Sequence, residues 1–360
     1  MNVSELLDCR LRNTGLYGSP YNRAADAIKQ SGAVQAQDFT AAKWALGLRV
    51  RNSTDADIEN AFNNGTILRT HVMRPTWHFI LPEDIQWMLN LTAPRLKSIL
   101  SGSNQKLGLD AALFEKSNAT IVSALEGHTL LTRLELKSIL ADKGIKTDIQ
   151  RLAHLFIRAE LDGLICSGPR RGKQFTYALL EERVRGSETI TRDQSLEMLA
   201  RRYFTSHGPA QLKDFSWWSG LLGKEAVYAH DRIKSGLEKA TLDGRTFWYS
   251  PHAEVTALDS PFVLLLSIYD EYTIAYKDRR DISEARDIEQ LISMGNAVTA
   301  VIIINGRVAG TWKRALKRET IEITVNPFRK FDRDEQEAVE SEVIRYGKFF
   351  KIPAVIARGL

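Results

Sequence analysis

The chain contains few of the residues that mark metal-binding or disulfide-rich proteins. Its 360 residues include two cysteines, Cys9 and Cys166, which lie far apart and without further ligands at metal-binding spacing. The cysteine pattern therefore indicates neither a zinc site nor a disulfide framework, and we interpret both residues as reduced thiols. No metal and no cofactor is expected.

Membrane-length hydrophobic segments are also lacking. The most apolar run, residues 262–268, has the length of a strand. The first eight residues include Glu5 and Asp8 and no apolar core of a signal peptide. We therefore expect a soluble cytoplasmic protein without a membrane partner.

Several common catalytic motifs are missing. The sequence has no phosphate-binding loop, no Gly-x-Gly-x-x-Gly pattern and no Gly-x-Ser-x-Gly pattern, which argues against nucleotide-dependent chemistry and serine hydrolase chemistry. The charge is nearly balanced, with 49 Lys and Arg against 44 Asp and Glu, and the net charge is +5. This modest excess fits a nucleic-acid partner without establishing one.

One order of elements recurs along the chain, namely two or three helices followed by a short hairpin. In the clearest copy, capping boxes at residues 132–135 and 147–150 each predict the start of a helix. Strands are expected at 164–168 and 174–179, on either side of the turn 169–173. A winged helix has this order of elements: a helix, a tight turn, a second helix, and a hairpin, here with basic residues in its turn.

Basic side chains in this copy are candidates for DNA binding. The second helix carries Arg151, His154 and Arg158 at i, i+3 and i+7, where a recognition helix would face phosphates or base edges. The hairpin turn adds Arg170, Arg171 and Lys173. A solvated helix face beside a solvated turn would carry the same charges, so both interpretations stay open.

Similar units on both sides of this copy predict an α+β fold with three tandem winged-helix modules and a C-terminal β-barrel-like domain. We expect the modules at residues 1–110, 111–188 and 189–258, and the last domain at 259–360. The first module should contain a helix from about residue 54 to 64 and strands at 67–72 and 76–81.

The third module is expected to begin at a capping box, residues 191–194, and to end in a hairpin with an Asp243-Gly244 turn. In the C-terminal domain, the apolar runs predict strands at 262–269, 298–304, 307–311 and 319–325, and a charged helix at 332–346.

Two glutamines, Gln35 and Gln37, stand just before an amphipathic helix that we expect to begin at Asp38. Side chains at i and i+2 point to the same side of an extended backbone. Side-chain amides can hold a water molecule and do not titrate, which suits hydrolysis of a bond already primed to break. On the residues alone, two surface glutamines without a function are the commoner case.

The densest polar and aromatic cluster is residues 69–79. Its histidines have no cysteine or carboxylate at ligand spacing, so a metal site is not expected. We assign Arg69, His71 and Arg74 to DNA contacts, and Trp77 and Phe79 to packing within a hairpin.

Two charged segments stand out in the C-terminal part. Asp270 and Glu271 would point apart in a strand, so we expect a structural ion pair with the basic run 277–280 in place of a paired-carboxylate site. Lys313 and Arg314 are candidate phosphate contacts, with an exposed strand end as the alternative.

Taken together, segments spread over most of the chain resemble the AlkZ/YcaQ-like family of bacterial DNA glycosylases, which are tandem winged-helix proteins. The matching segments are AVQAQD at 33–38, LRTHVMRPTWH at 68–78, SHGPA at 206–210 with WWSG at 217–220, YDEY at 269–272 with YKDR at 276–279, and GRVAGTW at 306–312.

The resemblance implies three winged helices packed into a concave surface around DNA, and a C-terminal β-barrel-like domain. It also implies that Gln35-Ala36-Gln37 is the family's catalytic Gln-hydrophobic-Gln motif. One branch of the family has Asp at the second glutamine, and Gln37 makes this chain more similar to the branch that acts on interstrand crosslinks.

The resemblance thus implies a monofunctional DNA repair glycosylase that hydrolyses the N-glycosidic bond of N7-alkylated purines. Unhooking of interstrand crosslinks is a further activity that it implies. Its partner would be double-stranded DNA with bulky or cationic alkyl adducts, bound by a monomer. Two alternatives remain open: a winged-helix transcriptional regulator, which would bind one operator as a dimer, and a repair scaffold without chemistry.

Overall fold

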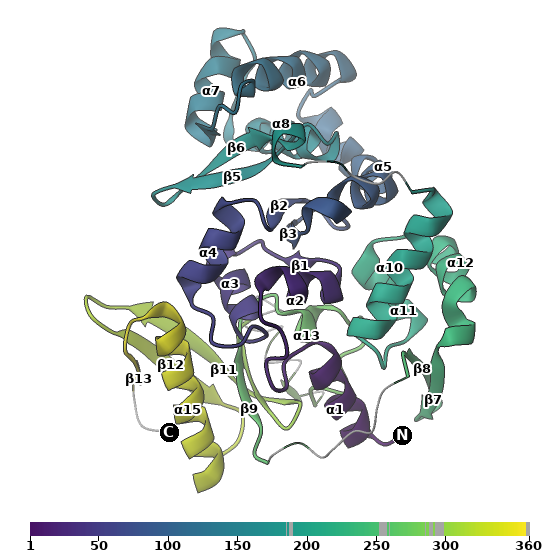
Figure 1. Cartoon of the computed structure of the whole chain (residues 1–360), viewed down its shortest axis with the longest axis vertical. Coiled ribbons are helices and arrows are strands. Elements are labelled where there is room, and N and C mark those ends of the chain that lie inside the picture. Colours follow the sequence, from purple (N-terminus) through teal and green to yellow (C-terminus); the bar gives the residue numbers. More distant parts are fainter. Residues whose placement is uncertain are drawn as a thin grey trace. The chain divides into compact units, whose positions relative to one another are not determined.

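The computed structural model (Figure 1) describes residues 1–184, 186, 190–251, 258, 260–284, 286–287, 291 and 299–357. The chain forms two compact units. Unit 1 comprises Met1–Glu59, Glu197–Trp218 and Leu222–Leu360, and unit 2 comprises Asn60–Leu196 and Ser219–Leu221. The expected module boundaries at 188/189 and 258/259 involve residues outside the described ranges.

Most of unit 2 has the predicted order of helices and strands. The elements are α6 (Ala111–Leu125), β4 (Leu131–Thr132), α7 (Arg133–Asp142), α8 (Ile149–Leu161), β5 (Ile165–Arg171) and β6 (Gln174–Leu179). The strands form an antiparallel sheet in the order β4-β6-β5. Thr132 caps α7 in the predicted capping box, which confirms that helix start. Helix α8 begins one residue later than its predicted capping box, because the side chain of Asp148 is its N-cap.

The core of this region follows the helical spacing of its apolar residues. Leu136 and Leu140 from α7 pack with Leu152 and Leu155 from α8, and all four are buried. Burying a side chain of this size stabilises the fold by roughly 1.5–3 kcal/mol. The core therefore fixes α8 against the sheet and leaves its other side to polar residues.

The rest of unit 2 supplies a second hairpin and a long helix. Strands β2 (Leu68–His71) and β3 (Trp77–Ile80) pair antiparallel, as predicted for the first hairpin. Helix α5 (Pro82–Lys106) begins with proline at its first position and packs against α8. Helix α4 (Asp55–Asn63), also predicted, lies where the two units meet in sequence.

Unit 1 begins with three helices around the Gln motif. These are α1 (Val3–Asn13), α2 (Ala24–Ser31) and α3 (Phe39–Gly47), with the short strand β1 (Val34–Gln35) between α2 and α3. Three more helices, of which α10 begins and α11 ends in unit 2, and the predicted hairpin follow. They are α10 (Arg192–Ser206), α11 (Leu212–Ser219), α12 (Gly223–Ile233), β7 (Glu238–Leu242) and β8 (Arg245–Tyr249). Asp243 and Gly244 both have positive φ, as the predicted tight turn requires.

The C-terminal part of unit 1 is a curled, half-barrel sheet in the order β13-β12-β11-β10-β9. Helix α15 (Arg333–Phe350) packs against β9 and β13 (Figure 1). The strands are β9 (Val263–Leu266), β10 (Val301–Ile304), β11 (Arg307–Leu316), β12 (Ile321–Pro327) and β13 (Ala354–Ile356).

The strand predicted at 262–269 ends at Leu266, because Asp270 caps a short helix, α13 (Glu271–Ile274). Residue 298, the predicted first residue of the next strand, lies outside the described ranges.

Both cysteines are buried and free. Burial raises the pKa of Cys166 to about 12. None of the helices in the described ranges is long and apolar enough to cross a membrane.

Candidate functional site

The Gln motif occupies a short connection that a helix holds at each end. Gly32, with φ +81°, closes α2. Asp38 opens α3, where its carboxylate accepts a hydrogen bond from the Ala41 backbone N–H at 2.9 Å. The expectation that Asp38 is an N-cap is confirmed.

The two glutamines have different surroundings. Gln35 is buried at the end of β1, whereas Gln37 is exposed in the bend before α3. The backbone N–H of Gln35 donates to Oε1 of Glu271 at 3.0 Å. Because the strand ends at Gln35, simple alternation along a strand no longer places both amides on one side.

The carboxylate that holds Gln35 is itself buried, and it belongs to α13. Oε2 of Glu271 accepts the indole N–H of Trp218 at 2.9 Å, and Nε2 of His207 lies 3.6 Å from the same oxygen. Glu271 and His207 are each 1% exposed. Three other segments that carried the family resemblance therefore meet next to the Gln motif.

Asp270, the neighbour of Glu271, has a separate structural role. It forms two hydrogen bonds with the buried guanidinium of Arg49, at 2.8 and 2.9 Å. It also accepts the backbone N–H of Tyr272 as the cap of α13. The expected ion pair of Asp270 and Glu271 with the run 277–280 was wrong, because both residues start a helix and face partners distant in sequence. An N-capping residue directly after a buried strand was the available signal.

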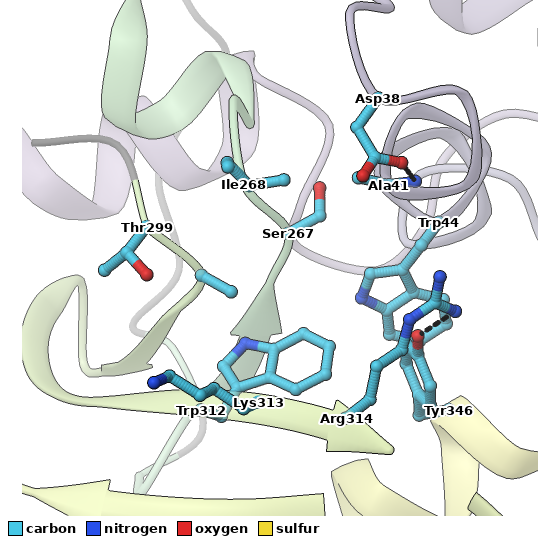
Figure 2. A pocket seen from close by; sticks show the side chains of 11 residues that line it. Asp38, Ala41, Trp44, Ser267, Ile268, Thr299, Trp312, Lys313, Arg314 and Tyr346 are labelled. Carbon is cyan, nitrogen blue, oxygen red and sulfur yellow. Dashed lines mark hydrogen bonds between the residues drawn. The ribbon is translucent and has the colours of Figure 1, made fainter. Parts of the chain in front are cut away.

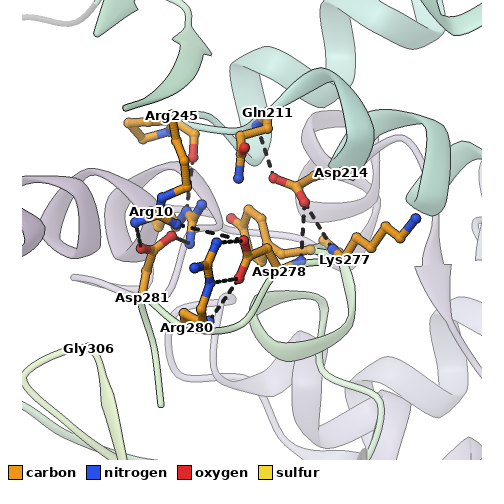
Figure 3. Close-up of polar contacts among 12 residues, drawn as sticks. Arg10, Gln211, Asp214, Arg245, Lys277, Asp278, Arg280, Asp281 and Gly306 are labelled. Carbon is orange, nitrogen blue, oxygen red and sulfur yellow. Dashed lines mark hydrogen bonds and ion pairs between the residues drawn. The ribbon is translucent and has the colours of Figure 1, made fainter. Parts of the chain in front are cut away.

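A network of charged residues supports the loop that follows α13 (Figure 3). The Arg10 guanidinium, fully buried, lies 3.9 Å from the Tyr276 ring centroid and 3.5 Å from the carboxylate of Asp281. Its Nε donates to the backbone oxygen of Pro209 at 2.9 Å. The Tyr276 hydroxyl donates to the backbone oxygen of His207 at 2.8 Å. This network fixes the segment that carries His207, and through it the surroundings of Glu271.

A cavity of about 310 Å³ lies next to the motif (Figure 2). Asp38 lines it, together with Lys313 and Arg314 and the rings of Trp44 and Trp312. Both indole N–H groups donate to backbone oxygens of β9, at 2.7 and 2.8 Å. The walls are therefore held rigidly, and the cations favour an anionic group such as a phosphate in the cavity.

Lys313 and Arg314 were predicted DNA contacts, and the structure brings them to this cavity beside the last residue of the motif segment. Both are exposed. Arg314 donates to the hydroxyl of Tyr346 at 2.8 Å and lies 5.4 Å from the Phe350 ring centroid. Within the described residues, Lys313 makes no such hydrogen bond or ring contact, so it is the more accessible of the two cations.

Unit 2 holds the remaining predicted contacts. Arg69 is buried between two rings, with its guanidinium 4.4 Å from the Trp77 centroid and 4.6 Å from the Phe175 centroid. His71 is also buried and its Nδ1 contacts the carboxylate of Glu160. Trp77 packs within the hairpin, 4.3 Å from the ring of His71. These contacts give Arg69 and His71 a structural role, and DNA binding by either stays a prediction.

Arg74 is half-buried in the turn between β2 and β3. One of its terminal nitrogens lies 3.2 Å from Nε2 of His78. Its place at a hairpin turn is compatible with the predicted phosphate contact.

The polar face of α8 contacts other parts of unit 2. Arg151 contacts the backbone oxygen of Leu107, and Nδ1 of His154 lies 2.6 Å from the side-chain oxygen of Asn104. Arg158 donates to Asp162 at 2.8 Å. All three side chains are half-buried. A role in reading DNA therefore stays a prediction for these residues, with intramolecular contacts as their observed role.

The tip of the β5–β6 hairpin is more open. Arg171 and Lys173 are exposed, although Arg171 pairs with Glu135 at 2.8 Å. Arg170 is half-buried and lies 5.5 Å from the Phe175 ring centroid. Lys173 is thus the most accessible of the predicted hairpin contacts.

Comparison with known proteins gives consistent results. The model of the AlkZ-like DNA glycosylase family matches residues 28–349. A curated Streptomyces sahachiroi protein, described as an interstrand DNA cross-link repair glycosylase, is 24% identical over 334 residues, which is 89% of this chain and 88% of that protein. The solved structure of Streptomyces sahachiroi DNA glycosylase AlkZ matches with a TM-score of 0.80 and 18% identity, over 99% of this chain and 100% of that chain.

The mixed α+β fold and the matched segments define a protein of the DNA glycosylase class. The chain belongs to the AlkZ-like DNA glycosylase family. The matched residues include both glutamines of the motif and the segment with Glu271. The predicted family is confirmed, and the transcriptional regulator is not favoured.

Proposed function

We propose that this protein is a monofunctional glycosylase that removes N7-alkylated purines from double-stranded DNA and unhooks interstrand crosslinks. The observation that carries the proposal is the Gln35–Gln37 segment, anchored through its backbone by the buried Glu271 and bordered by a cationic cavity. The description of the Streptomyces sahachiroi relative as a cross-link repair glycosylase supports the crosslink as a substrate.

The chemistry requires little from the protein besides positioning. Alkylation at N7 makes the purine cationic, so the base leaves as a neutral molecule when the bond between N9 and C1′ breaks and its electrons move into the ring. Water forms the new bond to C1′ and loses its proton to solvent. No general acid is needed, and what remains is to hold water and to stabilise an oxocarbenium-like transition state.

We assign the water to Gln37 and the deoxyribose, or a second water contact, to Gln35. Gln37 is exposed, so its amide oxygen can accept a hydrogen bond from a water molecule. The backbone N–H of Gln35 donates to Glu271, which fixes the position of this residue next to Gln37. Asp38 caps α3 with one carboxylate oxygen, which supports a glutamine as the residue that holds water.

The proposed DNA-binding architecture is three tandem winged-helix modules, at 1–110, 111–188 and 189–258, followed by the C-terminal domain at 259–360. Its support is the hairpin that follows helices in each module, at β2–β3, β5–β6 and β7–β8. The accessible cations at hairpins and at the cavity, among them Lys173 and Lys313, are the proposed phosphate contacts.

Substitution of Gln37 tests the proposal. An oligonucleotide duplex with a single N7-methylguanine is incubated with protein, treated with alkali to cut abasic sites, and resolved on a denaturing gel. We expect Gln37→Ala to slow strand scission by about 10²–10³-fold while DNA affinity is unchanged, because the positioned water is lost. Gln150→Ala, at an exposed glutamine of α8, serves as the matched control.

A crosslinked duplex separates the two parts of the proposal. Unhooking converts a slow-migrating crosslinked species into single strands. Gln37→Ala should lose both this reaction and the scission of the N7-methylguanine duplex. Scission of the monoadduct without unhooking would restrict the enzyme to single alkylated bases. Full activity of Gln37→Ala on both substrates would remove the motif from the mechanism.

A further inference from the structure

A second cavity, of about 450 Å³, lies within unit 2. The β2–β3 hairpin, the start of α7 and the β5–β6 hairpin form its walls. The volume falls in the range of roughly 300–1,000 Å³ that is typical of small-molecule sites. Leu134 stands 64% exposed at its edge, so the cavity is open to solvent.

The charge of this cavity is of one sign. Arg69, Arg133 and Lys173 line it, and the described lining residues include no carboxylate. Glu160 does not line the cavity, and its carboxylate accepts hydrogen bonds from the Trp77 indole and the His71 backbone, at 3.3 and 3.1 Å. Three cations around one cavity create a positive potential that favours an anionic ligand.

Aromatic rings form another part of the wall. Trp77, Phe175 and Tyr177 all line the cavity. The Arg69 guanidinium lies close to the rings of both Trp77 and Phe175. Tyr177 is supported by Phe156, whose ring stacks on it at 4.6 Å with an interplanar angle of 20°. Burial raises the pKa of Tyr177 well above its usual value, so its hydroxyl stays neutral and adds no negative charge.

We propose that this cavity binds one unpaired nucleotide of single-stranded DNA. Proteins that bind single strands combine cationic side chains, which contact the backbone, with aromatic rings, on which bases stack. Here Arg133 and Lys173 contact the phosphate, and the base stacks on the aromatic wall. An acidic peptide would use the cations and leave the aromatic wall unused, and a paired base has both faces covered by its neighbours.

This proposal depends on the proposed function in one respect only, namely that the ligand is DNA. A nucleotide that loses its partner at a damaged or crosslinked site is the kind of ligand the cavity would take. The site is argued from unit 2 alone and does not require the Gln motif.

Binding of a fluorescein-labelled oligothymidine of eight nucleotides, followed by anisotropy over a range of salt concentrations, tests the proposal. Removing one phosphate contact lowers the slope of log affinity against log salt by about 0.7 for a single strand. We expect this change, with an affinity loss of about fivefold or more, in Lys173→Gln. The matched variant Lys116→Gln, at an exposed lysine of α6 that does not line the cavity, should behave as wild type.

Photocrosslinking identifies the place of contact. An oligothymidine with one 5-iodo-deoxyuridine is irradiated with the protein, and crosslinked peptides are identified by mass spectrometry. Crosslinks at Trp77, Phe175 or Tyr177 are expected. Three outcomes would each overturn the proposal. They are crosslinks confined to other peptides, an effect of Lys116→Gln equal to that of Lys173→Gln, and binding of a labelled octaglutamate as tight as that of the oligothymidine.

The failure of this inference can be told from failure of the glycosylase proposal. Gln37→Ala should lose strand scission and keep oligothymidine binding and the crosslinks. A wild-type protein that cleaves alkylated duplexes without binding oligothymidine would refute the nucleotide site alone. A protein that crosslinks at the aromatic wall and cleaves neither substrate would refute the glycosylase proposal alone.

Discussion

Glu271 is the residue on which the geometry of the Gln motif depends most directly. Its two carboxylate oxygens accept N–H groups from Gln35 and Trp218, at 3.0 and 2.9 Å, in a site that is almost fully buried. A buried carboxylate is stable only when such donors satisfy it. In the proposed mechanism, Glu271 is therefore a positioning residue, which acts on the reaction through the backbone of Gln35.

Glu271→Gln is the direct test of this role. An amide has one acceptor oxygen, so one of the two buried N–H donors would lose its partner. We expect the free energy of unfolding to fall by about 1–3 kcal/mol, and the single-turnover rate of base release to fall while DNA affinity is unchanged. Chemical denaturation and single-turnover kinetics measure the two effects.

The control for this substitution is Glu340→Gln, which removes a charge from an exposed position of α15. It should change neither quantity. A Glu271→Gln enzyme with a wild-type rate, whatever its stability, would show that the motif does not need this anchor.

Asp278 makes the stability of unit 1 dependent on pH. Hydrogen bonds from Arg280, at 2.7 and 3.0 Å, and from Lys213, at 3.0 Å, hold the pKa of its carboxyl well below the usual range. Because the pKa is lower in the folded state than in the unfolded state, the ionised form favours folding. The resulting stability is present above about pH 4 and is lost as the pH falls below it.

Asp278→Asn should therefore lower the thermal midpoint at pH 7 and have a smaller effect at pH 3. Thermal unfolding at pH 3, 4, 5 and 7 measures this difference. Asp334→Asn, in the first turn of α15, is the control at an exposed aspartate. An equal effect of Asp278→Asn at pH 7 and pH 3 would contradict the role assigned to the ion pairs.

At the scale of elements, α8 has the polar face that the sequence predicted, but the observed contacts of that face are not the predicted ones. The i, i+3, i+7 spacing placed Arg151, His154 and Arg158 on one face, and the structure confirms that they share a polar face. That face contacts the end of α5 and Asp162, whereas a recognition helix presents such residues to the major groove. Side-chain spacing fixes a face, and packing decides what the face meets.

Arg158→Ala distinguishes the two roles. Loss of its ion pair with Asp162 and of its contact with the Phe114 ring, 4.8 Å away, should lower the free energy of unfolding by about 1 kcal/mol. The salt dependence of duplex binding should be unchanged, in contrast to Lys173→Ala. A slope reduced by about 0.9 with unchanged stability would instead restore α8 as a DNA-reading helix.

The elements found correctly share one property, namely that local residues define their ends. Side chains of Asp38, Thr132, Asp148 and Asp332 cap their helices. The short helix α13 was missed because four residues are too few to show a periodicity. The hairpin at Asp243-Gly244 was found because its turn chemistry is specific.

At the scale of the whole molecule, a glycosylase must search DNA without strong sequence preference. Such binding comes mainly from phosphate contacts and depends steeply on salt. We expect a panel of undamaged duplexes of different sequence to bind within about tenfold of one another, whereas a regulator prefers its operator by roughly 10³-fold or more. Fluorescence anisotropy at fixed salt measures this spread.

The same preparation tests the expected monomer. Sedimentation equilibrium should give one species near 40.6 kDa. A dimer, together with one preferred palindromic duplex, would return the transcriptional regulator to consideration.

The amino-acid sequence alone was enough to locate the Gln motif, the caps of its flanking helix and the hairpins, because these depend on residues a few positions apart. It did not reveal that Glu271 holds Gln35 across 236 positions of sequence, or that Arg49 binds Asp270 across 221. Such contacts arise when packing brings distant segments together, and one sequence contains no local signal of them. The residues of the candidate site could therefore be named from the chain, and the contacts that support them were visible only in the fold.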